Sequence, residues 1–231
     1  MKDRKKITAV VLAGGHGRRM QSDIPKQYLL LHGKPILYYS LMAFEQSKVD
    51  EIVLVTGEEE REYCRKEIVE RFGFQKVRAV VAGGKERYHS VYAGLKSCLG
   101  CDYVMIHDGV RPFLTEEMIE RSIEAVERDR ACAVGMPVKD TIKICDENGY
   151  VEQTPKREQV WMIQTPQSFE YCLIEQAYRM VIESGRAVTD DAMAVEIFLK
   201  EKVRLVEGSY ANIKITTPED LIIAEQMMKN N

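Results

Sequence analysis

The first 136 residues alternate short apolar runs with segments of helical length. Short apolar runs are typical of buried strands, and the longer segments between them are typical of helices. The expected strands are Thr8–Leu12, Glu51–Thr56, Val77–Ala82, Tyr103–Ile106 and Ala131–Met136. The expected helices are Pro35–Gln46, Glu59–Phe72, Arg87–Leu99 and Thr115–Arg130. This alternation predicts an α/β fold, in which a Rossmann-like, mostly parallel sheet is flanked by helices and ligands bind at the carboxyl ends of the strands.

The pattern changes between Val138 and Gln164. Two extended segments, Lys139–Cys145 and Tyr150–Thr154, flank a turn at Asp146–Gly149, which predicts a β-hairpin that leaves the main sheet. The regular alternation then resumes toward the end of the chain. Its expected elements are helices at Phe169–Ser184 and Thr189–Lys200, strands at Val203–Glu207 and Asn212–Ile215, and a final helix over Pro218–Lys229. We expect residues 1–231 to form a single domain, with residues 138–164 as a protruding arm.

Composition and charge exclude several classes of partner. The chain has 231 residues, 45% of them hydrophobic, which is enough to bury a substantial core. Its 33 Lys and Arg residues against 36 Asp and Glu residues give a net charge of −3, which argues against a nucleic-acid partner. No apolar run approaches the ~18 residues that span a bilayer, and the charged N-terminus lacks a signal-peptide cleavage region. We therefore expect a cytoplasmic protein with no nucleic-acid and no membrane partner.

The six cysteines are scattered rather than spaced as a disulfide framework. Cys98 and Cys101 form a single C-x-x-C motif. A zinc site would need a second such pair or matching histidines, and a thioredoxin-type motif belongs at the start of a helix rather than at its end. We therefore expect no metal or redox role for this motif.

Glycine and positive charge gather in the loop after the first strand, which reads LAGGHGRRMQSDIPKQYL over Leu12–Leu29. The loop does not fit the dinucleotide fingerprint, because Met20 stands at its last glycine position, and it lacks the Gly-Lys-Ser/Thr of a P-loop. Glycines let backbone N–H groups approach an anion, and Arg19 and Lys26 would neutralise phosphate charge. Taken alone, the loop fits an ordinary strand–helix turn with solvated charges equally well.

Five segments together resemble the nucleotide site of sugar-phosphate cytidylyltransferases. They are Gly15–Met20, Pro25–Leu29, Gly83–Ser90, Ile106–Pro112 and Asn212–Thr216, in the order and at the spacing of that superfamily. Four segments resemble, within it, the 2-C-methyl-D-erythritol 4-phosphate cytidylyltransferase family. They are Arg18–Met20, Ser90–Leu95, Pro137–Lys143 and Val188–Ala192. The resemblance implies an enzyme of the non-mevalonate isoprenoid pathway that transfers CMP from CTP to the polyol phosphate and releases pyrophosphate.

The resemblance also implies a role for each matched residue. It assigns to Arg19 and Lys26 the stabilisation of charge on the α-phosphate in the transition state, for which fixed cations are suited. The implied nucleotide-binding residues are Ala13, Gly14, Gly15, Gly17, Gly83, Ser90, Asp108 and Gly109. The implied acceptor site contains the positioning residues Arg157 and Lys214 and the supporting residues Arg111, Thr141 and Thr165.

A triphosphate substrate calls for Mg²⁺ or another divalent cation, and Asp108 follows a predicted strand at the sheet edge where such a ligand belongs. His107 is expected to be a scaffold residue, since the attacking phosphate is already an anion and needs no general base. The resemblance further implies that residues 138–164 form a dimerisation arm that reaches the active site of the partner subunit. We therefore expect a homodimer with shared active sites.

Three departures from the family pattern leave the fine nucleotide preference open. Gly14 and the pair Gly109–Val110 stand where alanines are usual, and Lys85 stands where an acid is frequent. A ribitol-5-phosphate cytidylyltransferase, with the same fold and chemistry but a different polyol phosphate as acceptor, is an alternative, which the segment Ala13–Gly15 favours slightly. The adjacent residues Arg18 and Arg19 favour methylerythritol phosphate as the acceptor instead, and so does the segment Lys139–Lys143.

A second alternative is a regulator that binds a nucleotide without catalysis, on the scaffold of a decayed enzyme. The sequence argues against it, because all the residues to which the resemblance assigns the central charges of the reaction are present. These are Arg19, Lys26, Asp108, Arg157 and Lys214.

Overall fold

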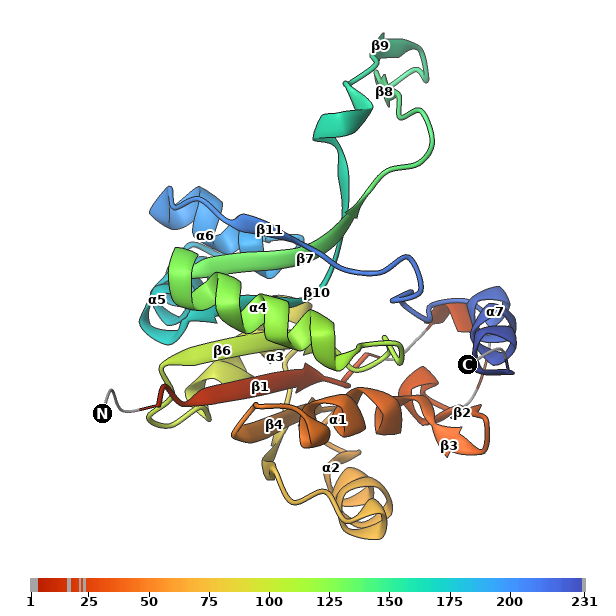
Figure 1. Ribbon diagram of the computed structural model, residues 1–231, viewed down its shortest axis with the longest axis vertical. Coiled ribbons are helices and arrows are strands. Elements are labelled where there is room, and N and C mark those ends of the chain that lie inside the picture. Colours follow the sequence, from red (N-terminus) through yellow and green to blue (C-terminus); the bar gives the residue numbers. More distant parts are fainter. Residues whose placement is uncertain (1–3, 16–17, 21, 23, 230–231) are drawn as a thin grey trace.

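The centre of the protein is a seven-stranded sheet, seen in a computed structural model that describes residues 4–15, 18–20, 22 and 24–229. The strands lie in the order β11-β7-β10-β6-β1-β4-β5 (Figure 1). Their bounds are β1 Ile7–Leu12, β4 Glu51–Thr56, β5 Val77–Ala82, β6 Tyr103–Asp108, β7 Ala131–Pro137, β10 Trp161–Glu170 and β11 Arg204–Glu207. Strand β10 is antiparallel to β6 and β7, whereas the other neighbouring pairs of this sheet are parallel. The predicted α/β fold with a mostly parallel sheet is confirmed.

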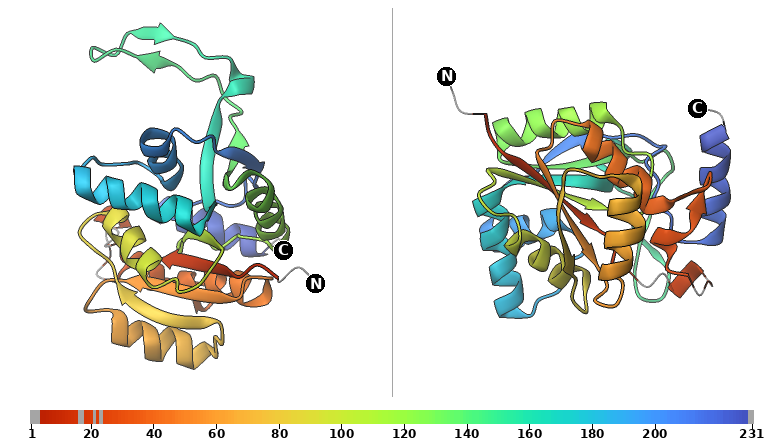
Figure 2. Two further views of the ribbon diagram at one scale, coloured as in Figure 1. Left: turned by 90° about the vertical axis from the view of Figure 1, so that its left-hand side faces the viewer. Right: turned by 90° about the horizontal axis from the view of Figure 1, so that it is seen from below.

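Helices cover both faces of the sheet (Figure 2). Their bounds are α1 Ile36–Gln46, α2 Arg61–Tyr63 with a π-helical continuation over Cys64–Glu70, α3 Arg87–Lys96, α4 Glu116–Asp129, α5 Tyr171–Ser184, α6 Asp191–Leu199 and α7 Pro218–Lys229. Successive residues of a strand point to opposite faces of the sheet, so the side chains of each strand contribute to two hydrophobic cores. Val11 packs in one core with α1 and α4, whereas Val10 packs in the other with α3, α5 and α6.

A smaller layer of structure packs beside the carboxyl ends of β1 and β6. It contains the two-stranded hairpin β2 Leu30–Leu31 and β3 Lys34–Pro35, together with α7. Its buried apolar residues are Met20, Leu31, Ile36, Val110, Ile215 and Ala224. The N–H of Ile215 donates to the carbonyl of Val110 over 2.9 Å, which ties the segment before α7 to the loop after β6. This layer holds Lys26 and Lys214 beside the end of β6.

The predicted hairpin protrudes from the body of the protein between β7 and β10 (Figures 1 and 2). It contains the short strands β8 Ile144–Cys145 and β9 Val151–Gln153, which are shorter than the predicted extended segments. The turn lies where the sequence predicts it: the N–H of Gly149 donates to the carbonyl of Asp146 over 3.1 Å, and Gly149 has a φ of 86° that favours glycine. The role of this arm in dimerisation stays a prediction.

Two sequence predictions are wrong. Strand β10 occupies residues that were assigned to the arm and to the start of a helix, and α5 begins only at Tyr171. Pro166 interrupts its strand pattern, and it is accommodated because the pairing with β7 shifts between Ile163 and Gln167. The predicted strand Asn212–Ile215 is a loop, because its amides bond to nearby turn carbonyls and to Val110 rather than to a neighbouring strand.

The C-x-x-C motif lies between α3, which ends at Lys96 instead of the predicted Leu99, and β6. Cys98 and Cys101 are buried free thiols, and no group of three or more potential metal-ligating side chains occurs among the described residues. Within the same residues, no helix has both the length and the apolar character that crossing a membrane requires.

Candidate active site

A pocket of about 480 Å³ opens at the carboxyl ends of the parallel strands, the position expected for a ligand in this type of sheet. It brings together seven residues that the sequence comparison assigned to one site: Ala13, Gly14, Gly15, Lys26, Ser90, Asp108 and Lys214. The lining also includes residues for which the sequence predicts no individual role: Gln27, Gly84, Lys85, Glu86 and Arg87. Residues from the two ends of the chain therefore meet in one cavity.

Ala13, Gly14, Gly15 and Gly84 form one wall of this pocket, and Gly83 adjoins it in the sequence without being one of the lining residues. Neighbouring atoms crowd Gly14 and Gly83, whereas the space beside Gly15 is open. A Cβ at Gly83 would lie 2.5 Å from the Ser90 hydroxyl, and a Cβ at Gly14 would lie 3.1 Å from the backbone carbonyl carbon of Thr56. The N–H of Gly84 donates to Ser90 Oγ over 3.1 Å. The backbone thus lines the cavity directly, as binding of a planar base or an anion requires.

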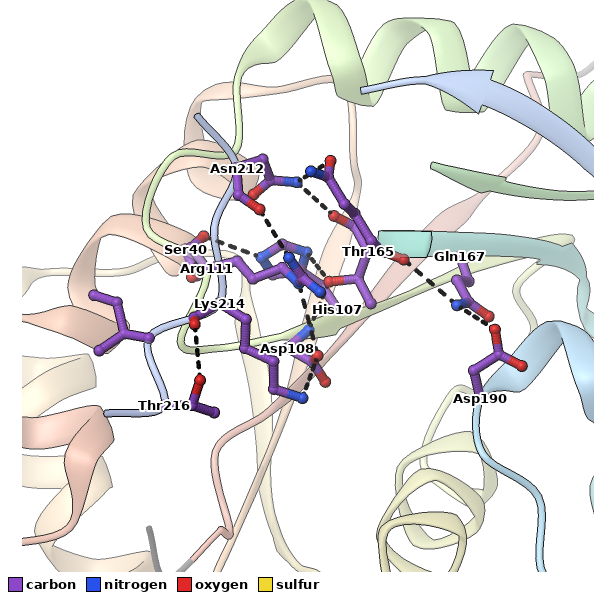
Figure 3. Close-up of polar contacts among 12 residues, drawn as sticks. Ser40, His107, Asp108, Arg111, Thr165, Gln167, Asp190, Asn212, Lys214 and Thr216 are labelled. Atoms are coloured by element: carbon purple, nitrogen blue, oxygen red, sulfur yellow. Dashed lines mark hydrogen bonds and ion pairs between the residues drawn. The ribbon is translucent and has the colours of Figure 1, made fainter. Parts of the chain in front are cut away.

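Asp108, at the end of β6, is the centre of the charged side chains (Figure 3). Its Oδ2 lies 2.8 Å from Lys214 Nζ and 3.7 Å from Arg111 Nε, and its Oδ1 lies 3.6 Å from Arg87 Nε. The residue is only 8% exposed, and burial alone would raise its pKa. The three cations outweigh burial and hold the pKa of Asp108 well below its usual range, so the carboxylate is ionised at neutral pH.

Lys26 faces the same cavity from the loop between β1 and β2. Its Nζ donates to the carbonyl of Ile215 over 3.3 Å. Burial lowers the pKa of Lys26 to about 8, and the nearby charge of Lys214 adds to this effect. The positive charges of Lys26 and Lys214 repel each other in this pocket, and an anion that enters reduces that repulsion. The arrangement therefore favours a polyanionic ligand.

The Asn212–Thr216 segment is a loop that Asn212 anchors to β10. The fully buried Asn212 side chain donates to the backbone carbonyl of Thr165 over 3.0 Å, and the backbone carbonyl of Asn212 accepts from Arg111 Nη1 over 2.8 Å (Figure 3). Two residues later, Lys214 reaches Asp108. The loop geometry therefore explains why an asparagine and a lysine stand two positions apart.

His107 and Thr165 support Asp108 from beneath rather than line the pocket. The N–H of Asp108 donates to Thr165 Oγ1 over 3.1 Å, and Oγ1 lies 3.0 Å from His107 Nδ1. Burial lowers the pKa of His107 to about 4, so the ring is neutral at pH 7. With Nε2 facing the carbonyl of Arg111 at 3.4 Å, the network assigns the ring proton to Nε2 and leaves Nδ1 to accept from the threonine hydroxyl. This arrangement matches the scaffold role expected for His107.

The remaining predicted residues lie at or beyond the margin of the pocket. Arg19 is exposed in a short turn, Arg18–Met20, and its charge contributes to lowering the pKa of Lys26. Thr141 and Arg157 are exposed on the protruding arm, and Arg157 Nη1 donates to the carbonyl of Lys139 over 3.2 Å. Gly17 lies outside the described residues.

Gly109, the residue after Asp108, is confined by its neighbours. A Cβ there would lie 2.8 Å from Leu37 Cδ1 and 3.0 Å from the carbonyl oxygen of Leu12. These close neighbours fix the position of the chain directly after the end of β6.

Sequence reasoning missed the ion pair of Arg87 with Asp191, which spans 104 positions of the chain. Both residues lie in segments that carried the family resemblance, Gly83–Ser90 and Val188–Ala192. Their individual roles were not distinguished, because an acid at the start of a helix is ordinarily explained by the helix dipole.

Comparisons with known proteins agree with this geometry. A model of the 2-C-methyl-D-erythritol 4-phosphate cytidylyltransferase family matches residues 7–230. The chain is 49% identical over 228 residues to the protein of that name from Lachnoclostridium phytofermentans, covering 98% of each chain. It is 50% identical over 225 residues to the one from Lachnospira eligens, covering 96% of this chain and 99% of the relative.

A solved structure is similar along almost the whole chain. The crystal structure of 4-diphosphocytidyl-2C-methyl-D-erythritol synthase from Anaerococcus prevotii has a TM-score of 0.87 and 38% sequence identity, covering 97% of this chain and 96% of that one. Family model, sequence relatives and fold thus agree with the motifs that meet in the pocket. The chain belongs to the 2-C-methyl-D-erythritol 4-phosphate cytidylyltransferase family.

Proposed function

We propose that this protein transfers CMP from CTP to 2-C-methyl-D-erythritol 4-phosphate, with release of pyrophosphate, for isoprenoid precursor synthesis. The observation that carries the proposal is the convergence of Lys26, Lys214 and the ionised Asp108 on a pocket walled by small residues. The cations suit a triphosphate, and the wall beside Ser90 suits a pyrimidine. We assign residues 1–231 to a single nucleotidyltransferase domain and, because CTP is a cytoplasmic metabolite, place the protein in the cytoplasm.

In the proposed reaction, a phosphate oxygen of the acceptor attacks the α-phosphorus of CTP, and the bond to pyrophosphate breaks. Lys26 and Arg19 stabilise the charge that accumulates on the α-phosphate oxygens, and they do so most effectively when held in place before the substrate arrives. The attacking phosphate is already an anion and needs no base. The neutral, fully buried His107 accordingly takes no part in proton transfer.

The donor set suits a divalent cation that the nucleotide helps to hold. Mg²⁺ commonly binds through one or two carboxylates together with substrate phosphates and water. The described residues contain no three-ligand protein site, but Asp108 offers one ionised carboxylate at the pocket wall. Asp108 would hold the metal, which supplies positive charge to the phosphates when bound.

The acceptor site, in this proposal, combines two subunits of a homodimer. Lys214 contributes from the pocket and Arg111 from beside Asp108, with Thr165 beneath them. Arg157 and Thr141 contribute from the partner's arm. The support is the exposure of the arm: Tyr150 on it is 73% exposed, and Thr141 and Arg157 are exposed and do not line the pocket of their own chain. The hairpin is rich in charged residues but also exposes the apolar side chains of Ile142, Ile144, Tyr150 and Val151, which suit contact with another chain.

Acceptor specificity tests the proposed function. With CTP and Mg²⁺, methylerythritol phosphate should release pyrophosphate at least ~10-fold faster than ribitol 5-phosphate, which corresponds to about 1.4 kcal/mol of discrimination. The measurement is kcat/KM for each acceptor in a coupled pyrophosphate assay, with glycerol 3-phosphate as a control for unspecific transfer. A reversed ratio would make ribitol phosphate the acceptor, and nucleotide binding without turnover would indicate a regulator.

The pH dependence tests the charge of Lys26. Only the protonated amine stabilises phosphate charge, and its pKa of about 8 in the free protein predicts that kcat/KM for CTP falls as the pH rises through 8. The value of kcat should hold to higher pH, because the bound triphosphate stabilises the protonated lysine. Lys26→Arg, whose guanidinium stays charged, should lose the decline even if its activity is lower overall. An identical decline in both proteins would assign the ionisation to another group.

A further inference from the structure

A fully buried carboxylate behind the pocket holds Arg87. Asp191 is the first residue of α6, and both of its oxygens accept from Arg87, Nη1 to Oδ1 and Nη2 to Oδ2, each over 2.7 Å. The hydroxyl of the buried Tyr178 also donates to Oδ1. Because a buried charge without a partner is strongly destabilising, the two short contacts make Arg87 and Asp191 a buried ion pair in which each side chain depends on the other.

Arg87 lies between two carboxylates and pairs fully with only one of them. The two terminal nitrogens of its guanidinium face Asp191, while Nε faces Oδ1 of Asp108 at 3.6 Å, which is too long for a hydrogen bond. A guanidinium binds a carboxylate most strongly through two parallel hydrogen bonds, and Asp191 receives both. Arg87 therefore contributes charge near Asp108 without closing a bidentate pair on it.

The two oxygens of Asp108 consequently have different surroundings. Oδ2 is occupied by Lys214 at 2.8 Å and lies near Arg111, whereas Oδ1 faces only the restrained Arg87 among the recorded ion pairs of the described residues. Asp108 and Arg87 both line the pocket. Oδ1 is thus the oxygen of Asp108 left for a ligand that enters with the nucleotide.

We infer that Asp191 is a positioning residue that holds Arg87 away from Asp108, so that Oδ1 remains available to a divalent cation bound with CTP. The inference rests on the proposed assignment of Asp108 to the metal. Without the charge of Asp191, Arg87 is free to turn its terminal nitrogens onto Asp108 and to compete with the cation.

The test compares how strongly Mg²⁺ promotes CTP binding in the wild-type protein and in Asp191→Asn. This substitution preserves side-chain size and removes the charge. Titration calorimetry with CTP, once with Mg²⁺ and once with EDTA, gives the enhancement of affinity by the metal. We expect the enhancement to fall about 10-fold in the variant, which corresponds to about 1.4 kcal/mol, while binding in EDTA changes by less than about 3-fold.

Asp190→Asn is the matched control, because Asp190 is the neighbouring residue and, within the described part of the chain, its hydrogen bonds go to Gln167 and Met193 rather than to Arg87. It caps α6 by accepting from the N–H of Met193 over 2.9 Å, and asparagine caps a helix about as well as aspartate. Its metal enhancement should equal that of the wild type. An equal loss in both variants would make the effect a consequence of disturbing the start of α6 and would overturn the inference.

The double variant Arg87→Gln/Asp191→Asn separates positioning from general stability. It replaces the buried ion pair by two neutral amides, so it leaves no isolated charge and keeps the test open if Asp191→Asn alone does not fold. If Asp191 acts by restraining Arg87, the double variant should recover the wild-type enhancement to within about 3-fold. A double variant that still lacks the enhancement would contradict the inference.

The outcomes also separate the inference from the function beneath it. Wild-type protein that binds CTP with metal enhancement, together with an unchanged Asp191→Asn, would overturn the inference alone. Wild-type protein whose CTP affinity is the same in Mg²⁺ and in EDTA would overturn both the metal assignment of Asp108 and the inference built on it.

Discussion

Replacement of Lys26 by alanine is expected to lower kcat by about 10²-fold or more while the protein remains folded, because a cation that acts on the transition state is lost. Lys26 is suited to this role since its amine is drawn into the pocket, where burial and Lys214 lower its pKa. Its side chain donates to the backbone carbonyl of Ile215, so the substitution removes no apolar side chain from the core.

The measurement is steady-state pyrophosphate release, with circular dichroism and thermal unfolding to check the fold. Lys34→Ala is the matched control, because Lys34 belongs to the same small layer but is exposed and contacts the ring of Tyr38 instead of the pocket. It should retain activity within about 3-fold, as expected for a surface substitution. A folded Lys26→Ala protein with near wild-type kcat would remove Lys26 from the reaction.

Most of the fold follows from local patterns. The parallel strands β1, β4 and β5 were predicted within a residue of their bounds, because each is a short apolar run in a chain that alternates strands with helices. Strand β10 was missed because its pattern contains Pro166, and only the shifted pairing with β7 shows how a residue without an N–H fits there.

The site was predictable where motifs follow strands and unpredictable where distant residues pair. Asp108 ends an apolar run, so its place at the sheet edge follows from the sequence. The contact of Arg87 with Asp191 depends on how α3 and α6 pack on the same face of the sheet, and no local pattern contains that information.

Gly14 and Gly109 stand where the family pattern usually has alanine, and the structure gives a physical reason for glycine at both positions. A Cβ at Gly14 would lie unusually close to the backbone of Thr56, at 3.1 Å. A Cβ at Gly109 would lie 2.8 Å from Leu37 Cδ1, which is closer than real contacts allow unless that side chain shifts. These two glycines therefore avoid close contacts, Gly14 in the pocket wall and Gly109 directly after β6. They do not remove any of the charged residues that face the pocket.

The second large effect concerns the sharing of sites between subunits. If the arm carries Arg157 into the neighbouring subunit, each active site joins Lys26 of one chain to Arg157 of the other. Homodimers of Lys26→Ala and of Arg157→Ala should then both be poor catalysts. In a mixed dimer one site carries both lesions and is inactive, whereas the other site retains both residues and is intact, as two-fold symmetry requires.

Activity after the two variants are unfolded and refolded together tests the central claim, that the pocket around Lys26 and the arm of a second chain form one active site. Random exchange of equal amounts makes roughly half of the dimers mixed, so roughly a quarter of wild-type activity should return. Each variant treated alone is the control. A mixture no more active than the average of its parents, with mixed dimers confirmed by mass, would contradict the account and place Arg157 in the site of its own chain or outside the site altogether.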